Sequence, residues 1–344
     1  MYSPLFYGML LPFLFIINVL FNKNVVLIIT FIIFVLLLSF RGEVVGNDTH
    51  TYISIFESLS STSSNFFTEN KEFLFIKLNM LLSEQGFSYS FLFFVCALLS
   101  LLPFYLMISK YSDSYSLSIS IFCSIGPFLF MHSGMRQGVS IGLFYLVLYF
   151  YLNKRYLLSI ISFFASLNFH TSSIVSAIFL IFKKKKNEFF LYITLLLSSL
   201  IAFFPSMQSL IFKLLFFLVP SKYIELVTFQ LSENVSSLGL RNIFLSLMCV
   251  ILIFSTRRTI NSNEIMIINI SIFGILLNNF FSSFDLLSRV VAYFTPALCI
   301  AIPISYSLLF KGKNRLYADL LTIIVFIFFL QRTILTDNLR IFNV

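Results

Sequence analysis

Residues 25–52 read VVLIITFIIFVLLLSFRGEVVGNDTHTY. Residues 25–40 form a nearly continuous apolar run, and a polar stretch begins at Arg41. A membrane-spanning helix needs about 20 apolar residues, within a range of about 17–25, so this run predicts a span. The polar stretch continues to Glu72, where the chain turns apolar again. Ionisable groups at a membrane edge are costly and indicate function. The stretch 41–72 is therefore the first candidate site.

The composition excludes an ordinary soluble domain. The chain is 59% hydrophobic and 11% charged, with a mean hydropathy of +0.97, whereas soluble domains are roughly 25% charged. We expect an all-α, polytopic membrane helix bundle that forms one transmembrane domain over residues 1–344. The four cysteines lie inside apolar runs, so they are interpreted as buried, unpaired side chains.

Ten apolar stretches are predicted to cross the membrane. They are residues 4–21, 25–40, 88–109, 114–131, 137–152, 189–205, 242–256, 265–281, 290–310 and 316–332. The stretch 73–83 is too short to cross. The stretch 156–182 is long, but the sequence NFHTSS interrupts it at 168–173, which predicts a re-entrant helix hairpin with His170 near its tip.

Basic residues set the predicted orientation. If both flanks of the hairpin are cytoplasmic, alternation of the spans places all of the net charge of +9 on the inner side. The long connections 41–87 and 206–241 are then outer loops. The predicted outer face also carries Arg41, Asp48, Arg136, His170 and Arg289. Because this orientation accounts for the positive charge, no nucleic-acid partner is needed.

The first motif is RGEVVGNDTHTY at 41–52. Gly46 permits a tight turn, and Asn47 or Asp48 can cap a helix that starts near Thr49. Asp48 and Tyr52 would share a helix face at the i, i+4 spacing. Two readings remain open: a helix cap followed by an interfacial tyrosine, or an aspartate beside a substrate cavity with Arg41 as an anion ligand.

The second motif is MHSGMRQG at 131–138, between two apolar spans. Arg136 is either an arginine that extends to the head groups or, at a helix start, part of a diphosphate site. Gly138, Ser140 and Gly142 follow it and predict close helix packing.

Two further motifs lie later in the chain. In FHTSS at 169–173, His170 either satisfies local backbone or acts in catalysis. In DLLSRVVAYF at 285–294, Arg289 and Tyr293 are i, i+4 neighbours and form either an interfacial anchor or part of a site. No metalloprotease pattern and no nucleophile elbow occurs, so we expect neither a zinc site nor a serine nucleophile.

Taken in order, these motifs resemble those of a known family. The sequence from Arg41 through Gly46-Asn-Asp48 and Tyr52 to Lys71-Glu72-Phe73 is similar to the opening of EpsG-type polysaccharide polymerases. The later motifs around Arg136-Gln137, Phe169-His170 and Ser288-Arg289 also match in order, across most of the chain. The family is similar to the Wzy polymerases of O-antigen and capsule.

The resemblance implies a glycosyltransferase that joins oligosaccharide repeat units carried on undecaprenyl diphosphate. It implies a multi-pass protein of the bacterial inner membrane, surrounded by membrane lipid, with the reaction at the periplasmic face. It allows a chain-length regulator protein as a partner. Because the donor carries its own leaving group, we expect no nucleotide pocket and no cofactor. No motif of the sequence requires a metal ion, so we also expect catalysis without one.

The resemblance also suggests roles for the site residues. His170 and Asp48 compete as the general base for the acceptor hydroxyl. Arg41, Arg136 and Arg289 would stabilise the departing diphosphate. The substrate-binding candidates are Arg41, Tyr52, Glu72, Gln137 and Tyr293, with Glu72 also the third candidate base.

Two other classes of protein stay open. A lipid-linked glycan flippase or other transporter would carry ionisable residues at mid-depth in its spans, whereas the charges here lie mostly at span ends and in loops. An O-antigen ligase would share the donor but transfer the glycan to the lipid A core. The sugars and the linkage are not encoded in any motif of this sequence.

Overall fold

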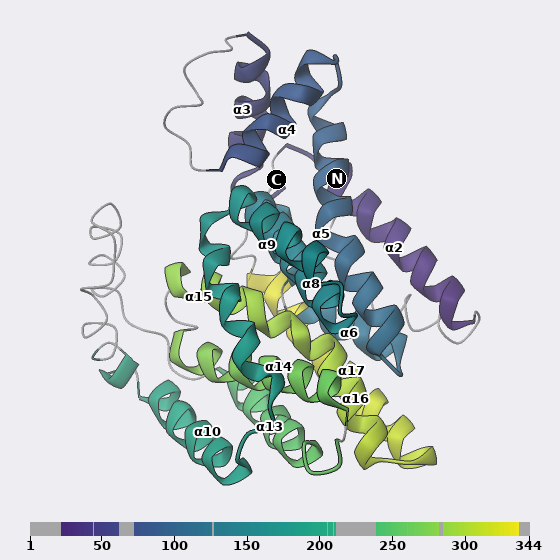
Figure 1. Cartoon of the computed structure of the whole chain (residues 1–344), viewed down its shortest axis with the longest axis vertical. Helices are drawn as coiled ribbons and strands as arrows, with labels where there is room; N and C mark the ends of the chain where they lie inside the picture. Colours follow the sequence, from purple (N-terminus) through teal and green to yellow (C-terminus); the bar gives the residue numbers. More distant parts are fainter. Residues whose placement is uncertain are drawn as a thin grey trace. The chain divides into compact units, whose positions relative to one another are not determined.

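The computed structural model describes residues 22–43, 45–61, 72–125, 127–204, 206–208, 210, 239–259, 261–281 and 285–336. Within these ranges every regular element is an α-helix or a 3-10 helix, and no strand occurs (Figure 1). The elements are α2 Lys23–Ser39, α3 Thr49–Ser61, α4 Phe73–Glu84, α5 Tyr89–Tyr111, α6 Tyr115–Ser124, α7 Pro127–Ser133, α8 Met135–Leu152, α9 Tyr156–Phe169, η1 Thr171–Lys183, α10 Glu188–Phe203, α13 Leu240–Ser255, α14 Ser262–Phe281, α15 Asp285–Phe294, η4 Thr295–Ala297, α16 Leu298–Leu309 and α17 Gly312–Thr336. The predicted all-α fold is confirmed.

The predicted spans coincide with helices wherever the structure describes them; the stretch 4–21 lies outside the described residues. Among the described residues, five helical segments are long and apolar enough to cross a membrane: Tyr89–Tyr111, Met135–Leu152, Ser262–Phe281, Leu287–Leu309 and Gly312–Gln331. The bent pair α6 and α7 is a sixth candidate. Helices α2, α10 and α13 are shorter, at 16 or 17 residues. The chain is a polytopic membrane helix bundle, while the number of ten spans remains a prediction.

The sequence had suggested one span over 114–131, but this stretch is not one straight helix. Helices α6 and α7 meet there at an angle of 44°. Pro127 is the first residue of α7, a position that proline favours because it has no backbone N–H to pair and its fixed φ suits a helix start. The proline therefore begins a new helix instead of continuing the first.

The predicted interruption at His170 is confirmed. Helix α9 ends at Phe169, His170 is extended with φ −158° and ψ 121°, and η1 follows. The 3-10 form of η1 was not expected. Its buried residues are Ser173, Ser176, Phe179 and Phe182, one in every three, which matches the three residues per turn of a 3-10 helix. How this hairpin sits in a membrane remains a prediction.

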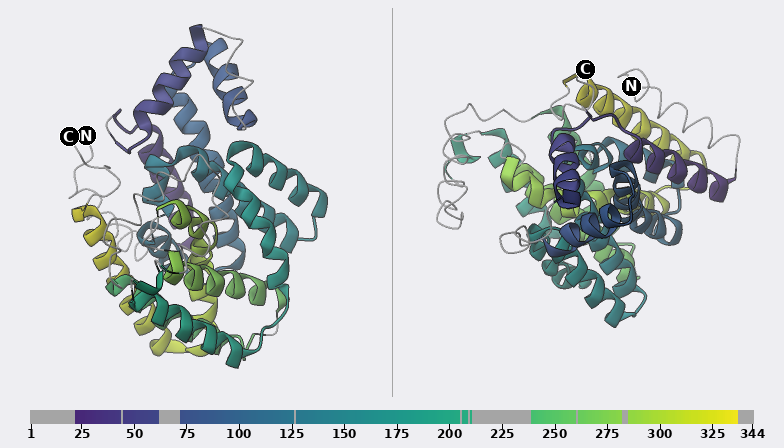
Figure 2. Two further views of the ribbon diagram at one scale, coloured as in Figure 1. Left: turned by 90° about the vertical axis from the view of Figure 1, so that its left-hand side faces the viewer. Right: turned by 90° about the horizontal axis from the view of Figure 1, so that it is seen from above.

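The contacts between residues form two compact units, Met1–Ala177 with Leu298–Val344, and Ile178–Ala297. In the first unit, α5 packs against α2 and α8, and α8 packs along α9 (Figures 1 and 2). A Cβ atom at Gly142 of α8 would lie 2.6 Å from the carbonyl oxygens of Leu99 and Ser100 in α5. The hydroxyls of Ser140 and Ser166 lie 2.9 Å apart between α8 and α9. The close packing predicted from the small residues of α8 is confirmed.

The helix ends of the first unit gather as the orientation argument predicts. At one end, Lys23 donates a hydrogen bond to the carbonyl of Asp113, at 3.3 Å, and Lys110 donates one to Asn153. Arg41, at the opposite end of α2, contacts Met131. Residues assigned to one side of the membrane therefore meet one another in this unit, while the identity of each side remains a prediction.

In the second unit, helices α10, α13 and α14 are joined by polar side chains. The amide Nδ2 of Asn279 lies 3.3, 3.4 and 3.1 Å from the hydroxyls of Ser198, Ser199 and Ser246. A Cβ atom at Gly274 of α14 would lie 2.8 Å from the backbone of Phe294, so these segments pack closely. Interhelical hydrogen bonds and small residues are the usual means by which helices associate in lipid.

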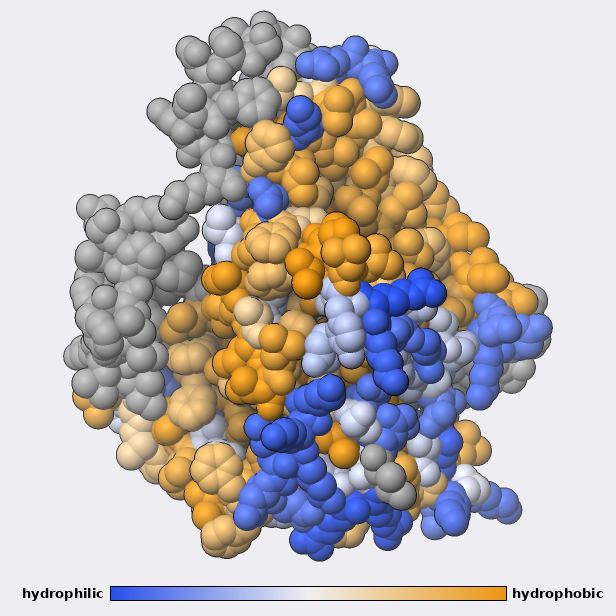
Figure 3. Space-filling model, in the orientation of Figure 1, coloured by the Kyte–Doolittle hydropathy of each residue, from blue (hydrophilic) through white to orange (hydrophobic). Residues whose placement is uncertain are grey.

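The surface is rich in apolar side chains, as expected for a protein in lipid. Large hydrophobic residues are exposed along α9, including Leu157, Ile161 and Phe164. Figure 3 shows wide apolar areas beside smaller hydrophilic patches. All four cysteines are buried and unpaired, which confirms their interpretation from the sequence.

Candidate active site

Glu72 lies where three separate parts of the first unit meet. It occupies the residue before α4 and makes no capping bond to its own helix. One carboxylate oxygen, Oε1, lies 2.5 Å from Nδ1 of His170, and the other, Oε2, lies 2.5 Å from Nη1 of Arg136. The carboxylate therefore joins two residues that the sequence had placed in separate motifs.

The protonation of this group follows from its surroundings. Burial alone would raise the pKa of the Glu72 carboxyl, but the hydrogen bond with His170 and the positive charge of Arg136 outweigh burial and hold the pKa below its ordinary value of 4.5. Glu72 is thus ionised at neutral pH and can only accept hydrogen bonds. Nδ1 of His170 must then donate, so in the neutral ring Nε2 carries the lone pair.

His170 is held in place by the break that the sequence predicted. Its backbone N–H donates to the carbonyl of Ser166, and its own carbonyl accepts from the N–H of Ser173, at 3.0 and 3.1 Å. The side chain is 20% exposed. The Nδ1 hydrogen bond fixes the orientation of the ring and the side chain is partly exposed, an arrangement that suits a general base.

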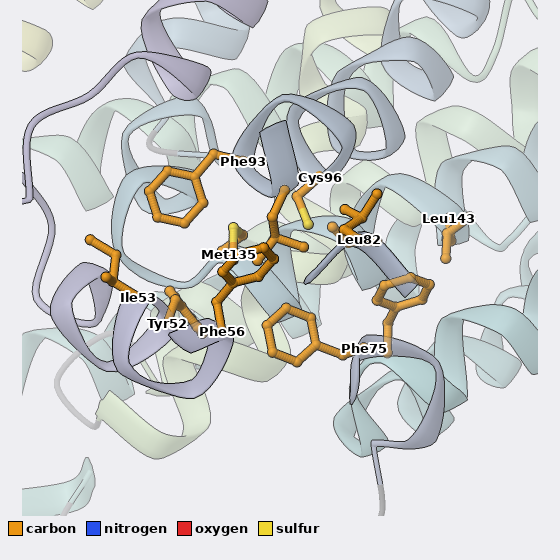
Figure 4. Close-up of a cluster of buried hydrophobic side chains, with 12 residues drawn as sticks. Tyr52, Ile53, Phe56, Phe75, Leu82, Phe93, Cys96, Met135 and Leu143 are labelled. Carbon is orange, nitrogen blue, oxygen red and sulfur yellow. The ribbon is translucent and has the colours of Figure 1, made fainter. Parts of the chain in front are cut away.

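Arg136 is the second residue of α8, after Gly134 at the capping position. Its guanidinium carbon lies 5.6 Å from the ring centre of Tyr52 and 5.7 Å from that of Phe75. Figure 4 shows Tyr52, Phe75 and Met135 within one buried cluster that joins α3, α4, α5 and α8. The side chain of Arg136 is 35% exposed. Its guanidinium therefore lies on an aromatic surface and still reaches solvent.

Tyr52 supports this arrangement from α3. Its side chain is 2% exposed. Burial raises the pKa of the Tyr52 phenol, against the opposing effect of the Arg136 charge. Tyr52 therefore stays protonated at neutral pH and contributes a neutral ring to the arginine.

The predicted turn and helix start near Asp48 are confirmed. Gly46 has φ +89°, and α3 begins at Thr49, with the carbonyl of Asp48 accepting from the N–H of Tyr52 at 3.0 Å. Asp48 is exposed whereas Tyr52 is buried, so only Asp48 of this i, i+4 pair is open to solvent. The choice of Asp48 as base remains a prediction.

Arg41 and Gln137 are more buried than a surface ligand would be. Arg41 is 5% exposed and Gln137 is 4% exposed. The Nη1 of Arg41 donates to the carbonyl of Met131 at 3.1 Å, and its guanidinium lies 4.4 Å from the ring centre of Phe93. Arg41 thus packs against the residues that precede Arg136, and contact of Arg41 or Gln137 with substrate stays a prediction.

Arg289 and Tyr293 belong to the second unit. On α15, Arg289 is exposed, whereas Tyr293 is completely buried. The side chain of Tyr293 is thus enclosed by other residues, and its role as a substrate ligand stays a prediction. In the described part of the chain, no group of three or more His, Cys, Asp or Glu side chains could hold a metal ion. Metal independence stays a prediction.

The geometry can now be set beside known proteins. The sequence pattern of the EpsG family matches residues 24–343, nearly the whole chain. The chain belongs to the EpsG family. No curated protein and no solved structure matches it. Membership of the EpsG family supports, in general terms, a membrane glycan polymerase-type role.

Proposed function

We propose that this EpsG protein is a polysaccharide polymerase of the bacterial inner membrane. It joins oligosaccharide repeat units carried on undecaprenyl diphosphate into an O-antigen, capsule or exopolysaccharide at the periplasmic face. The observation that supports this most is the pairing of His170 and Arg136 on the two oxygens of Glu72. A base and a cation for a leaving anion are the two groups that such a transfer needs.

The proposed reaction follows from these positions. Nε2 of His170 takes the proton of the acceptor hydroxyl while the hydroxyl oxygen attacks the anomeric carbon of the donor. The bond from that carbon to the diphosphate oxygen breaks, and its electron pair leaves with the diphosphate. Glu72 stabilises the imidazolium that forms, and Arg136 stabilises the negative charge on the diphosphate.

Arg136 suits the diphosphate for two reasons. A guanidinium presents paired N–H donors in one plane, which match phosphate oxygens. Its place in the first turn of α8 also puts it at the end of a helix that favours negative charge. Arg289 is kept as a second proposed ligand of the diphosphate, and Asp48 as an alternative base.

The proposal is tested with the full chain in proteoliposomes that contain lipid-linked repeat units. Wild-type protein is expected to convert single units into chains, and His170→Gln to slow this by about 10²–10⁴-fold, the usual contribution of general base catalysis. His50→Gln is the matched control, since His50 is exposed on α3. Chain growth by His170→Gln at the wild-type rate would refute the mechanism.

Cells that lack the chain separate the proposed polymerase from the alternatives. A polymerase defect leaves single repeat units, on the carrier lipid or transferred as one unit to the cell surface. A transporter defect leaves no units at the outer face. A ligase defect leaves long chains on the carrier lipid, and either of the last two results would contradict the proposal.

A further inference from the structure

The turn 41–49 is bound to the end of α7. Backbone carbonyls in the last turn of a helix have no partner within the helix and need one elsewhere. Two hydrogen bonds come from the turn: Arg41 Nη1 to the carbonyl of Met131 at 3.1 Å, and Asn47 N–H to the hydroxyl of Ser133 at 3.0 Å. The hydroxyl of Thr49, which donates to the carbonyl of Val45, also lies 3.4 Å from the carbonyl oxygen of His132. The turn therefore supplies partners to the last residues of α7.

Gly46 brings the turn close enough for these bonds. Its φ of +89° suits glycine, and a Cβ atom there would lie 2.2 Å from the carbonyl oxygen of His132. A contact below 3.0 Å cannot persist without movement of the backbone. Gly86 provides a comparison, because its φ is +77° but a Cβ atom would meet nothing within 4 Å. At Gly46 the close approach adds to the conformational requirement.

The junction that the turn holds leads directly into Arg136. Helix α7 ends at Ser133, and α8 starts at Met135 after Gly134. Arg41 contacts both sides of this junction, since its Nη2 also lies 3.9 Å from Sδ of Met135. The position of the turn thus determines where α8 begins and from which point the side chain of Arg136 extends.

We propose that the turn 41–49 is a positioning element for Arg136, and that Arg41 acts through Arg136 instead of binding the diphosphate itself. This inference rests on the proposed function. The buried guanidinium of Arg41, placed between Phe93 and the end of α7, is committed to holding the junction. Displacement of Arg136 by as little as 1 Å would lower the rate by about 10²-fold.

The first test compares glycine substitutions. Gly46→Ala is expected to slow chain growth by about 10²-fold through a lower kcat, in protein that reaches the membrane at the wild-type level. Gly86→Ala, outside the turn, has the same type of φ without the contact. This control is expected to stay near the wild-type rate. A wild-type rate for Gly46→Ala would overturn the proposal.

A second test remains decisive if Gly46→Ala does not fold. Arg41→Lys is made alone and together with Arg136→Lys. If Arg41 acts through Arg136, its substitution slows wild-type protein but adds little in the Arg136→Lys background. Independent contact with the diphosphate would give losses that multiply, and that result would refute the positioning role.

A third measurement distinguishes this inference from the proposed function. Failure of wild-type protein to polymerise lipid-linked units would refute the function alone. The turn can then be tested by thermal unfolding. The loss of stability caused by Glu72→Gln is expected to be smaller in the Arg41→Lys background, because a displaced Arg136 pairs less well with Glu72. An unchanged loss would contradict the positioning role whatever the activity.

Discussion

Nδ1 of His170 lies 2.5 Å from Oε1 of Glu72, although 98 residues separate them in the sequence. The same carboxylate contacts Arg136 on its other oxygen, at 2.5 Å. Three motifs that are weak when taken one at a time therefore meet at one ionised group. The predictions below test what this group does and how the protein holds it.

The arginines are expected to act through shape as well as charge. Arg136→Lys keeps the charge but cannot form paired, planar hydrogen bonds with a diphosphate. We predict that it loses most polymerisation, and that Arg289→Lys does the same. Arg155→Lys, at an exposed residue before α9, is the control and is expected to behave as wild type. Normal long chains from both variants, at normal protein level, would make these arginines interfacial anchors.

The stability contributed by Glu72 should depend on pH. Because its folded-state pKa lies below the ordinary value of 4.5, the contribution is complete above that value and is lost as pH falls through the lowered pKa. We predict that Glu72→Gln unfolds at a lower temperature than wild type at neutral pH, and that the two converge in acid. Thermal unfolding in detergent across this range measures the difference. A constant difference would mean that the ionised form has no part in stability.

The hydrogen bond between α8 and α9 is expected to contribute measurably to the free energy of unfolding. These two helices position Arg136 and His170. Ser166 donates to the carbonyl of Ser140 at 2.8 Å, inside the bundle. Ser166→Ala is expected to lower the free energy of unfolding by about 0.6–1.7 kcal/mol, the range found for such bonds in membrane proteins. Ser109→Ala is the control, because its exposed hydroxyl bonds only to its own helix. Equal effects of the two substitutions would mean that the hydrogen bond between α8 and α9 adds no stability.

The predicted orientation can be tested by labelling. After replacement of the four cysteines, Ser54→Cys on α3 and Lys184→Cys after η1 provide exposed sites on the two predicted sides. An impermeant thiol reagent should label residue 54 and not residue 184 in intact spheroplasts. The opposite pattern would place the outer loop 41–87 in the cytoplasm and overturn the orientation.

The helices were predictable because apolar composition decides them. Long runs such as 88–109 leave few alternatives in lipid, where backbone groups must pair within the segment. The break at His170 and the turn at Gly46 were also predictable, since both depend on local polar or glycine residues. The bend before Pro127 had a local signal too, but it was overlooked within a continuous apolar run.

The central role of Glu72 was not predictable, because pattern rules extend only to neighbours three or four residues away. Glu72 is separated by 64 residues from Arg136 and by 98 from His170. From the sequence, Glu72 is only the third candidate for the general base, after His170 and Asp48. Asp48 sits beside recognisable turn residues, and Glu72 does not. The aromatic support for Arg136 was missed for the same reason, because Tyr52 and Phe75 belong to different helices.

The most direct measurement is the rate of chain growth by His170→Gln, Glu72→Gln and the double variant, with lipid-linked units at saturating concentration. Groups that act as one unit give losses that do not multiply. If His170 and Glu72 act as one unit, each single variant lowers kcat with little change in KM, and the double variant is no slower than His170→Gln alone. Losses that multiply, or a double variant that retains the wild-type rate, would contradict the proposed joint action of His170 and Glu72.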